Sequence, residues 1–219
     1  MDNMTMPSII GIDEAGRGPI LGPLVMCGVC ADENAIAKIE KIGAKDSKLL
    51  STKQREQMYK KLVKIPHKLM ILEPAQIDAA IVSANSNLNW LEAEHAINIV
   101  NNFDAEKAYI DCPSPNLKAY KEFLLRILTR KTELIVEHKA EKYPVVAAAS
   151  IIAKVTRDAM IEELKKKIGI DFGSGYLSDP LTVAFLNEHY LNHAQLFRKQ
   201  WGPYKALIEK KVQMTLSRF

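Results

Sequence analysis

The 219-residue sequence contains few of the residues on which disulfide or thiolate chemistry depends. Its three cysteines are too few for a four-cysteine zinc site. Cys27 and Cys30 form a C-x-x-C motif, but both fall in an apolar run over residues 24–31 that is typical of a strand. A spacing of three places two strand side chains on opposite faces. We therefore interpret Cys27, Cys30 and Cys112 as small apolar residues.

Long hydrophobic runs are also missing. No apolar stretch approaches the roughly 20 residues that span a bilayer, and the first residues lack the basic start and apolar centre of a signal peptide. We expect a cytoplasmic monomer without membrane contact. With 47% hydrophobic and 26% charged residues, the chain is suited to one large α/β domain or a domain with a small helical appendage.

An excess of charge is missing from the first two thirds of the chain. Residues 1–150 hold 19 Lys and Arg against 19 Asp and Glu, whereas residues 151–219 hold 11 against 7. The net charge of +4 therefore resides entirely in the last third. This distribution suits a polyanionic partner bound by the C-terminal region, although a small excess of this kind more often serves solubility alone.

The most informative stretch covers residues 9–19. An apolar run of strand length ends in Asp13 and Glu14, and the turn Gly16-Arg17-Gly18 follows at once. Neighbouring strand side chains point to opposite faces, so we expect the backbone to leave strand geometry near Glu14 if both carboxylates reach one site. The glycines permit such a departure. Taken alone, the stretch could also be a strand that ends in a polar turn.

Two later strands end in acidic residues as well. Asp111 closes a predicted strand that begins at residue 107, and Glu141 follows one at residues 134–138. Because the carboxyl ends of such strands form one edge of an α/β sheet, we expect these acids to lie near Asp13 and Glu14. Clustered carboxylates repel one another unless a cation intervenes. Mg²⁺ or Mn²⁺ suits an all-oxygen site, and two such ions can support phosphodiester cleavage.

A second class of enzyme also uses paired carboxylates. A glycosidase also uses two carboxylates, but it gives no reason for the glycine turn or the basic C-terminal region.

Periodicity and turn residues predict further strands at 24–31 and 67–72 and helices at 33–42, 51–64, 75–83, 90–103, 115–129, 145–168, 180–191 and from 202. Ser51 and Gln54 predict a capping box, and Asp179 predicts an N-cap. A composition shift near residue 170 predicts a catalytic domain at 1–170 and a helical C-terminal region with a tail at 171–219.

Five motifs occur in the order found in one enzyme family. They are Asp13-Glu14-Ala15-Gly16-Arg17-Gly18-Pro19, Lys45-Asp46-Ser47-Lys48, Tyr109-Ile110-Asp111, Ala148-Ala149-Ser150-Ile151-Ile152-Ala153-Lys154-Val155-Thr156-Arg157-Asp158 and Gly173-Ser174-Gly175-Tyr176. Over residues 8–205 the chain resembles type 2 ribonuclease H, archaeal ribonuclease HII in particular. One motif would be weak support, whereas five in order are specific.

The resemblance implies a ribonuclease H-like α/β fold, with a five-stranded mixed sheet flanked by helices and a C-terminal helical extension. It implies Mg²⁺- or Mn²⁺-dependent cleavage of RNA in RNA–DNA hybrids and at single ribonucleotides in duplex DNA. Asp13, Glu14, Asp111 and Glu141 would be the catalytic, metal-binding acids. Substrate would be bound by the main chain of Gly16, Arg17 and Gly18, by Tyr176 on the following deoxyribose, and by Lys48, Ser150, Lys154 and Arg157 as phosphate contacts or site support.

The chain departs from the family pattern at three positions. Leu177 stands where proline is usual, and Ala147 stands where serine is common. The fourth acid is Glu141 in place of aspartate, in a segment one residue shorter, and its extra methylene adds roughly 1.5 Å of reach. Two alternatives stay open at this stage. One is a catalytically silent protein that binds hybrids, and the other is a related nuclease such as a junction resolvase.

The last residues suggest a partner. Gln213, Leu216 and Phe219 follow the final basic helix at spacings of three, which resembles the peptide by which replication enzymes dock on the sliding clamp. Leu216 and Phe219 would share one side of a helical turn and enter an apolar groove. The motif usually has two aromatic residues, whereas this chain has one. The alternative interpretation is a frayed terminus.

Overall fold

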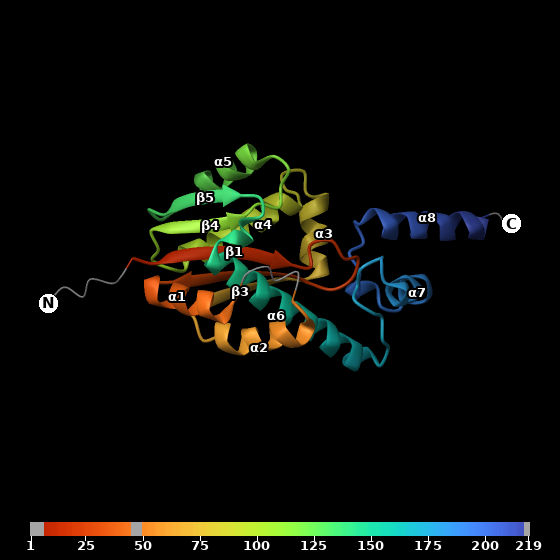
Figure 1. The fold of residues 1–219 in the computed structure, drawn as a ribbon. Coiled ribbons are helices and arrows are strands. Elements are labelled where there is room, and N and C mark those ends of the chain that lie inside the picture. The colour runs from red at the N-terminus through yellow and green to blue at the C-terminus, as the bar shows by residue number, and fades with distance from the viewer. Residues whose placement is uncertain (1–6, 45–49, 217–219) are drawn as a thin grey trace. The chain divides into compact units, whose positions relative to one another are not determined.

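The computed structural model describes residues 7–44 and 50–216, with side chains up to residue 213. Figure 1 shows the strands and helices. The strands are β1 (Ile9–Ala15), β2 (Leu24–Ala31), β3 (His67–Leu72), β4 (Lys107–Asp111) and β5 (Glu133–Glu137). The helices are α1 (Glu33–Ile42), α2 (Thr52–Leu62), α3 (Pro74–Val82), α4 (Leu88–Asn101), α5 (Leu117–Ile127), η2 (Ala140–Lys142), α6 (Pro144–Ile168), α7 (Pro180–His189), η3 (Ala194–Leu196) and α8 (Gly202–Leu216).

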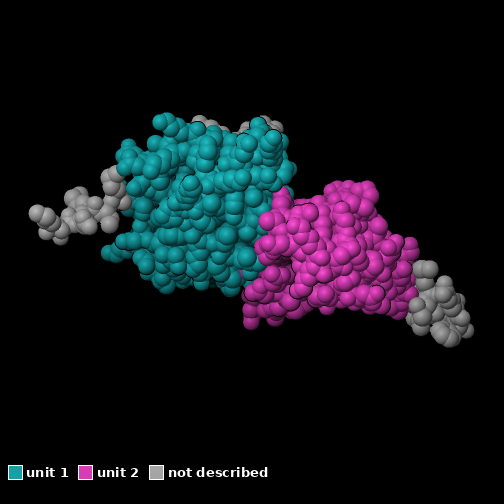
Figure 2. Space-filling view, turned by 90° about the horizontal axis from the view of Figure 1, so that it is seen from below, with its two compact units in different colours: residues 1–15, 25–71, 89–156 teal, residues 16–24, 72–88, 157–219 magenta. Residues whose placement is uncertain are grey.

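The chain divides into two compact units, coloured teal and magenta in Figure 2. The first unit comprises residues 1–15, 25–71 and 89–156, and the second comprises residues 16–24, 72–88 and 157–219. The chain thus passes between the units five times: directly after β1, after residues 24, 71 and 88, and within α6. The domain boundary that composition predicts, near residue 170, falls inside the second unit. The predicted domains, 1–170 and 171–219, stay a prediction.

The first unit is built on a five-stranded sheet in the order β3-β2-β1-β4-β5. Strands β1 and β2 pair antiparallel, as expected for a hairpin, whereas β1 pairs parallel with β4 and β4 pairs parallel with β5. This mixed sheet is the one that the resemblance to type 2 ribonuclease H implies. In the β1–β4 register Ile12 lies opposite Ile110, so Asp13 and Asp111 are the next residues on the two strands.

Glycines let two helices approach the sheet closely. A Cβ atom at Gly11 of β1 would lie 2.7 Å from Cγ2 of Val145 and would overlap the first turn of α6. A Cβ atom at Gly28 of β2 would overlap the side chain of Ile99 in α4. Gly28 pairs with Ile12, the neighbour of Gly11, and adjacent strand residues face opposite sides. Helices α4 and α6 therefore cover opposite faces of the sheet.

The second unit has its own apolar core. The segment after β1 pairs briefly with the segment after η3: Leu21 forms a bridge with Phe197, and the N–H of Gly22 donates to the Leu196 carbonyl. This pairing joins parts of the chain that are about 175 residues apart in sequence. The buried core residues are Ile20, Leu21, Ile161, Phe172, Phe185, Leu186, Leu196, Phe197 and Tyr204.

The predictions about helix caps are confirmed. Ser51 and Gln54 form a capping box at the start of α2, and the Asp179 side chain caps α7. None of the cysteines forms a disulfide, and Cys27 and Cys112 are buried. Burial raises the pKa of the Cys112 thiol. Within residues 7–44 and 50–216, no helix is both long and apolar enough to cross a membrane.

Candidate active site

Two of the predicted acids, Asp13 and Asp111, lie on neighbouring strands at the carboxyl edge of the sheet, and a third, Glu141, lies in η2. Asp13 is almost completely buried, with 5% of its surface exposed. Asp111 is half-buried at the end of β4, and its Oδ1 accepts the N–H of Ala140 at 2.8 Å. That bond holds the first residue of η2, the short helix that carries Glu141. The end of β4 therefore fixes the start of the turn from which the fourth acid projects.

The pKa of Asp13 depends on several neighbouring groups. The pKa of Asp13 is raised from 3.8 to about 7, mainly by burial and also by the negative charges of Asp111 and Glu141. Hydrogen bonds from the Ser150 side chain and from the N–H of Glu14 act in the opposite direction. Asp111, Glu141 and Ser150 are therefore close enough to act on one carboxylate, as the sequence predicts for the acids.

Glu14 does not behave as expected. Strand β1 continues through Ala15, and Glu14 keeps regular pairing with Met26, so the predicted departure from strand geometry near Glu14 is wrong. Antiparallel pairing with β2 holds this stretch extended. Asp13 and Glu14 consequently leave β1 on opposite faces. The negative charges of Asp111, Glu14 and Glu92 all raise the pKa of Cys112, after the larger effect of burial.

Glu92 is an acid that the sequence analysis did not select. It lies in α4 and is completely buried. Its position among the apolar residues of an amphipathic helix is the only feature in the sequence that could have indicated it. Together with Asp111 and Glu14, it acts on Cys112 and so belongs to the same electrostatic neighbourhood.

The donor set suits a hard divalent cation. The carboxylates of Asp13, Asp111 and Glu141 offer only oxygen ligands, and Mg²⁺ and Mn²⁺ prefer such ligands. Among residues 7–44 and 50–216, no three His, Cys, Asp or Glu side chains form a ready group that could hold a metal ion. The raised pKa of Asp13 is the observation that favours a cation here, because a positive charge would offset both its burial and its acidic neighbours.

The glycine turn belongs to the second unit. Gly16 is buried and has φ of 86°, a conformation that side-chain-bearing residues rarely adopt. A Cβ atom there would lie 2.5 Å from Cδ of Arg157 and 2.7 Å from the Pro23 carbonyl oxygen. Gly18, at the other end of the turn, is exposed. Only glycine fits at position 16, so the turn has little freedom to change.

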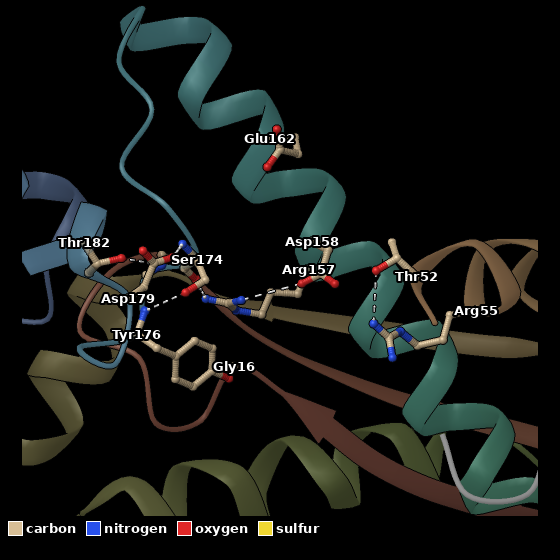
Figure 3. Close-up of polar contacts among 12 residues, drawn as sticks. Gly16, Thr52, Arg55, Arg157, Asp158, Glu162, Ser174, Tyr176, Asp179 and Thr182 are labelled. Carbon is tan, nitrogen blue, oxygen red and sulfur yellow. Dashed lines mark hydrogen bonds and ion pairs between the residues drawn. The ribbon is translucent and has the colours of Figure 1, made fainter. Parts of the chain in front are cut away.

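Arg157 organises the loop that presents Tyr176. Its side chain is 1% exposed, its Nη2 donates to the Ser174 carbonyl at 3.1 Å, and its guanidinium lies 5.2 Å from the centre of the Tyr176 ring. Figure 3 shows this arrangement, in which Asp179 also accepts the N–H of Ser174. Thr182 adds a further brace, accepting the N–H of Gly175. Burial favours site support over direct phosphate contact as the role of Arg157.

The remaining predicted residues are placed as follows. Ser150 and Lys154 are half-buried on α6, and Arg17 is half-buried in the turn. Gln213 is exposed on α8. Lys48 and Phe219 lie outside the described residues, and so does the side chain of Leu216, whose backbone ends α8. The predicted roles of these residues stay predictions.

Comparison with known proteins identifies the fold and the family. The ribonuclease HII from Pyrococcus horikoshii has a similar structure, described as ribonuclease H2, with a TM-score of 0.83 and 39% identity over 93% of this chain and 98% of that one. Ribonuclease HII in a complex with PCNA from Archaeoglobus fulgidus gives a TM-score of 0.79 and 39% identity, over 88% and 94% of the two chains. The predicted ribonuclease H-like fold is confirmed.

Sequence comparison agrees. The model of the family named Ribonuclease HII matches residues 10–203. Ribonuclease HII of Methanocella arvoryzae is 42% identical over 217 residues, which cover 97% of this chain and 96% of that protein. The chain belongs to the ribonuclease HII family. It is therefore a nuclease of the metal-dependent ribonuclease H class, whose activity is hydrolysis of RNA in RNA–DNA hybrids.

The conformation of Gly16 leads to a stability prediction with a matched control. Gly16 and Gly169 both have positive φ, but a Cβ atom at Gly169 would meet no atom within 4 Å. Gly169→Ala should cost about 1–2 kcal/mol from backbone strain alone. Gly16→Ala adds a clash with Arg157 and Pro23, so we expect a loss larger by about 1–3 kcal/mol. Denaturant unfolding of both variants measures the difference. Equal losses would mean that the turn can move away from the clash at little cost.

Proposed function

We propose that this ribonuclease HII cuts RNA in RNA–DNA hybrids and also cuts at single ribonucleotides embedded in duplex DNA, using two divalent ions. Asp13, Glu14, Asp111 and Glu141 are the proposed ligands. Glu14 leaves β1 on the other face from Asp13, but its charge and that of Asp111 both act on Cys112, so it lies near the same edge of the sheet. The observation that carries this proposal is the buried Asp13 carboxylate, whose pKa is raised to about 7 by burial and by the charges of Asp111 and Glu141. A site of this kind gains from binding a cation.

The protein groups prepare the edge of the sheet for that chemistry. Ser150 donates to Asp13, and Asp111 accepts from Ala140, so two of the carboxylates are held by hydrogen bonds before any ligand binds. When bound, Mg²⁺ or Mn²⁺ would supply charge neutralisation at the phosphate and a more acidic water. Fixed carboxylates lower the reorganisation needed in the reaction, which is a main source of rate acceleration in such sites.

Glu141 is proposed to replace the aspartate that is usual in the family. It is half-buried in η2. The residue before η2, Lys139, has a left-handed φ of 58°. The segment that is one residue shorter than the family pattern contains this tight turn. The charge of Glu141 acts on Asp13, which supports the view that the longer side chain reaches the same site.

The second unit is proposed to recognise the substrate. The main chain of Gly16, Arg17 and Gly18 would contact the 2′-OH that distinguishes RNA from DNA, and Tyr176 would pack on the deoxyribose that follows. Braces from Arg157 to Ser174 and the Tyr176 ring support this role, because they hold the aromatic ring in a set place. Lys48 and Lys154 are proposed phosphate contacts. A silent hybrid-binding protein would not need the intact acids Asp13 and Asp111.

A clamp partner is proposed for the C-terminal tail. The related Archaeoglobus fulgidus structure is that of a complex between PCNA and ribonuclease HII. We propose that Gln213, Leu216 and Phe219 bind such a clamp, which would bring the enzyme onto replicated DNA in the cytoplasm. Gln213 is exposed at the end of α8, where a partner can reach it.

The acids provide the test of the main proposal. On a duplex with one embedded ribonucleotide, we expect Mg²⁺-dependent cleavage by the wild type and none by Asp13→Asn, which should still bind the duplex. Glu141→Gln should lower the rate by about 10²-fold or more. Glu137→Gln is the matched control, because Glu137 is already engaged by Lys142 and Tyr143. Wild-type turnover by Asp13→Asn would remove the proposal, and a loss of only a few-fold in Glu141→Gln would leave three acids sufficient.

Tyr176 is tested by comparing substrates. Tyr176→Ala should slow cleavage at a single ribonucleotide more than cleavage of a continuous RNA strand, because only the first substrate places a deoxyribose directly after the ribonucleotide. Tyr176→Phe keeps the ring and should behave like the wild type on both. Single-turnover rates on the two substrates measure this, and equal losses for Tyr176→Ala would assign the ring a structural role.

The tail is tested with a peptide of residues 210–219 titrated onto a sliding clamp. We expect binding that is lost in the same peptide carrying Leu216→Ala and Phe219→Ala, because the two apolar side chains would enter the groove. No binding by the native peptide at near-millimolar concentration, or equal binding by both peptides, would leave the tail without this role.

A further inference from the structure

Arg198 is a buried arginine whose hydrogen bonds end on the glycine turn and its continuation. Its side chain is completely buried. Nη1 donates to the Arg17 carbonyl at 2.7 Å, and Nη2 donates to the Gly16 carbonyl at 2.5 Å. Nε and Nη2 also donate to the Gly22 carbonyl, at 3.2 and 3.1 Å. One guanidinium thus bonds both ends of the segment that leads out of β1.

Trp201 completes this support. Its Nε1 donates to the Gly18 carbonyl at 3.4 Å, and its ring lies 5.0 Å from the Arg198 guanidinium. The carbonyl oxygens of Gly16, Arg17 and Gly18 therefore all accept bonds from two side chains that stack on each other. A planar guanidinium suits this task because its donors form a rigid fork, whereas the ammonium of lysine is a single point.

The backbone that carries Arg198 is itself fixed. The N–H of Arg198 donates to the Ile20 carbonyl at 2.9 Å. The carboxylate of Asp78, on α3, accepts the N–H groups of Lys199 and Gln200 at 2.8 and 2.9 Å. The arginine thus projects from a segment anchored on both sides, so its position sets the position of the turn.

Peptide geometry gives this arrangement a functional consequence. In a planar trans peptide, the N–H of one residue points opposite to the carbonyl of the residue before it. Holding the carbonyls of Gly16 and Arg17 toward Arg198 therefore directs the N–H groups of Arg17 and Gly18 away from it. Successive N–H groups directed to one side form a site for an electron-rich oxygen.

We propose that Arg198 is a positioning residue that aims the N–H groups of Arg17 and Gly18 at the ribose 2′-oxygen of the substrate, with Trp201 assisting. This inference rests on the proposed function of the turn. Arg198 touches neither substrate nor metal in this scheme. It acts through the main chain, so its loss affects discrimination between ribose and deoxyribose and leaves general affinity for duplexes in place.

The test compares Arg198→Lys and Arg198→Met with the wild type. Dissociation constants are measured in EDTA for a duplex with one ribonucleotide and for the same duplex made only of DNA. We expect the preference for the ribonucleotide to fall by about tenfold, the effect of weakening one discriminating hydrogen bond, with affinity for the all-DNA duplex within about twofold of wild type, since phosphate contacts dominate that affinity. Cleavage with Mg²⁺ should slow in parallel.

Tyr204→Phe is the matched control for destabilisation. Tyr204 is in the same core and donates to the Tyr190 carbonyl, so its loss weakens the unit without touching the turn. It should keep the wild-type preference. An unchanged preference in Arg198→Lys and Arg198→Met, or failure of both to fold, would overturn the proposal. A wild type that cleaves but does not prefer the ribonucleotide in binding would also overturn it, whereas a wild type that cannot cleave would overturn the proposed function.

Discussion

The parallel pairing of β1 with β4 is the constraint on which the active site depends. Its register places Asp13 and Asp111 at equivalent positions of adjacent strands, so two carboxylates must share one edge of the sheet. Burial makes this costly, and the pKa of Asp13 is raised to about 7 in consequence. Ser150 and the Glu14 N–H offset only part of the effect. Burying neighbouring negative charges without a cation costs electrostatic free energy. A bound cation would reduce this cost, so the same arrangement favours metal binding.

Two buried arginines fix the segments that are proposed to recognise the substrate. From sequence, Arg157 is one of several basic residues suited to phosphate, yet its guanidinium is enclosed and braces the Tyr176 loop. Arg198 is enclosed as well and holds three carbonyls of the segment after β1. Inside a protein the guanidinium bonds strongly, since water does not compete for its donors. The positive charge of the C-terminal third is therefore partly structural.

Local features of the fold follow from sequence because their causes are local. The β1–β2 hairpin, the α2 capping box and the acids at strand ends depend on periodicity and on residues a few positions apart. The partners of Arg198 lie 176 to 182 residues away, a relation that no local pattern contains. Glu14 shows the complementary error: the glycines permit the backbone to leave strand geometry, but pairing with β2 keeps it extended. The burial of Glu92 could not be predicted from sequence, because the buried residues around it on α4 are apolar.

The proposed catalytic acids and the proposed recognition elements belong to different compact units of one chain. The three clustered acids and Ser150 belong to the first unit, whereas the glycine turn, Arg157, Arg198 and Tyr176 belong to the second. The units are joined covalently at five points, among them the end of β1, where the chain enters the turn, and the middle of α6. Packing changes in the sheet should therefore act on the acids and on rate, and packing changes in the second core should act on the turn and on selectivity. Residues 13–18 are the exception, because these six consecutive residues include both the proposed acids and the proposed recognition turn, so a substitution among them is expected to affect rate and selectivity together.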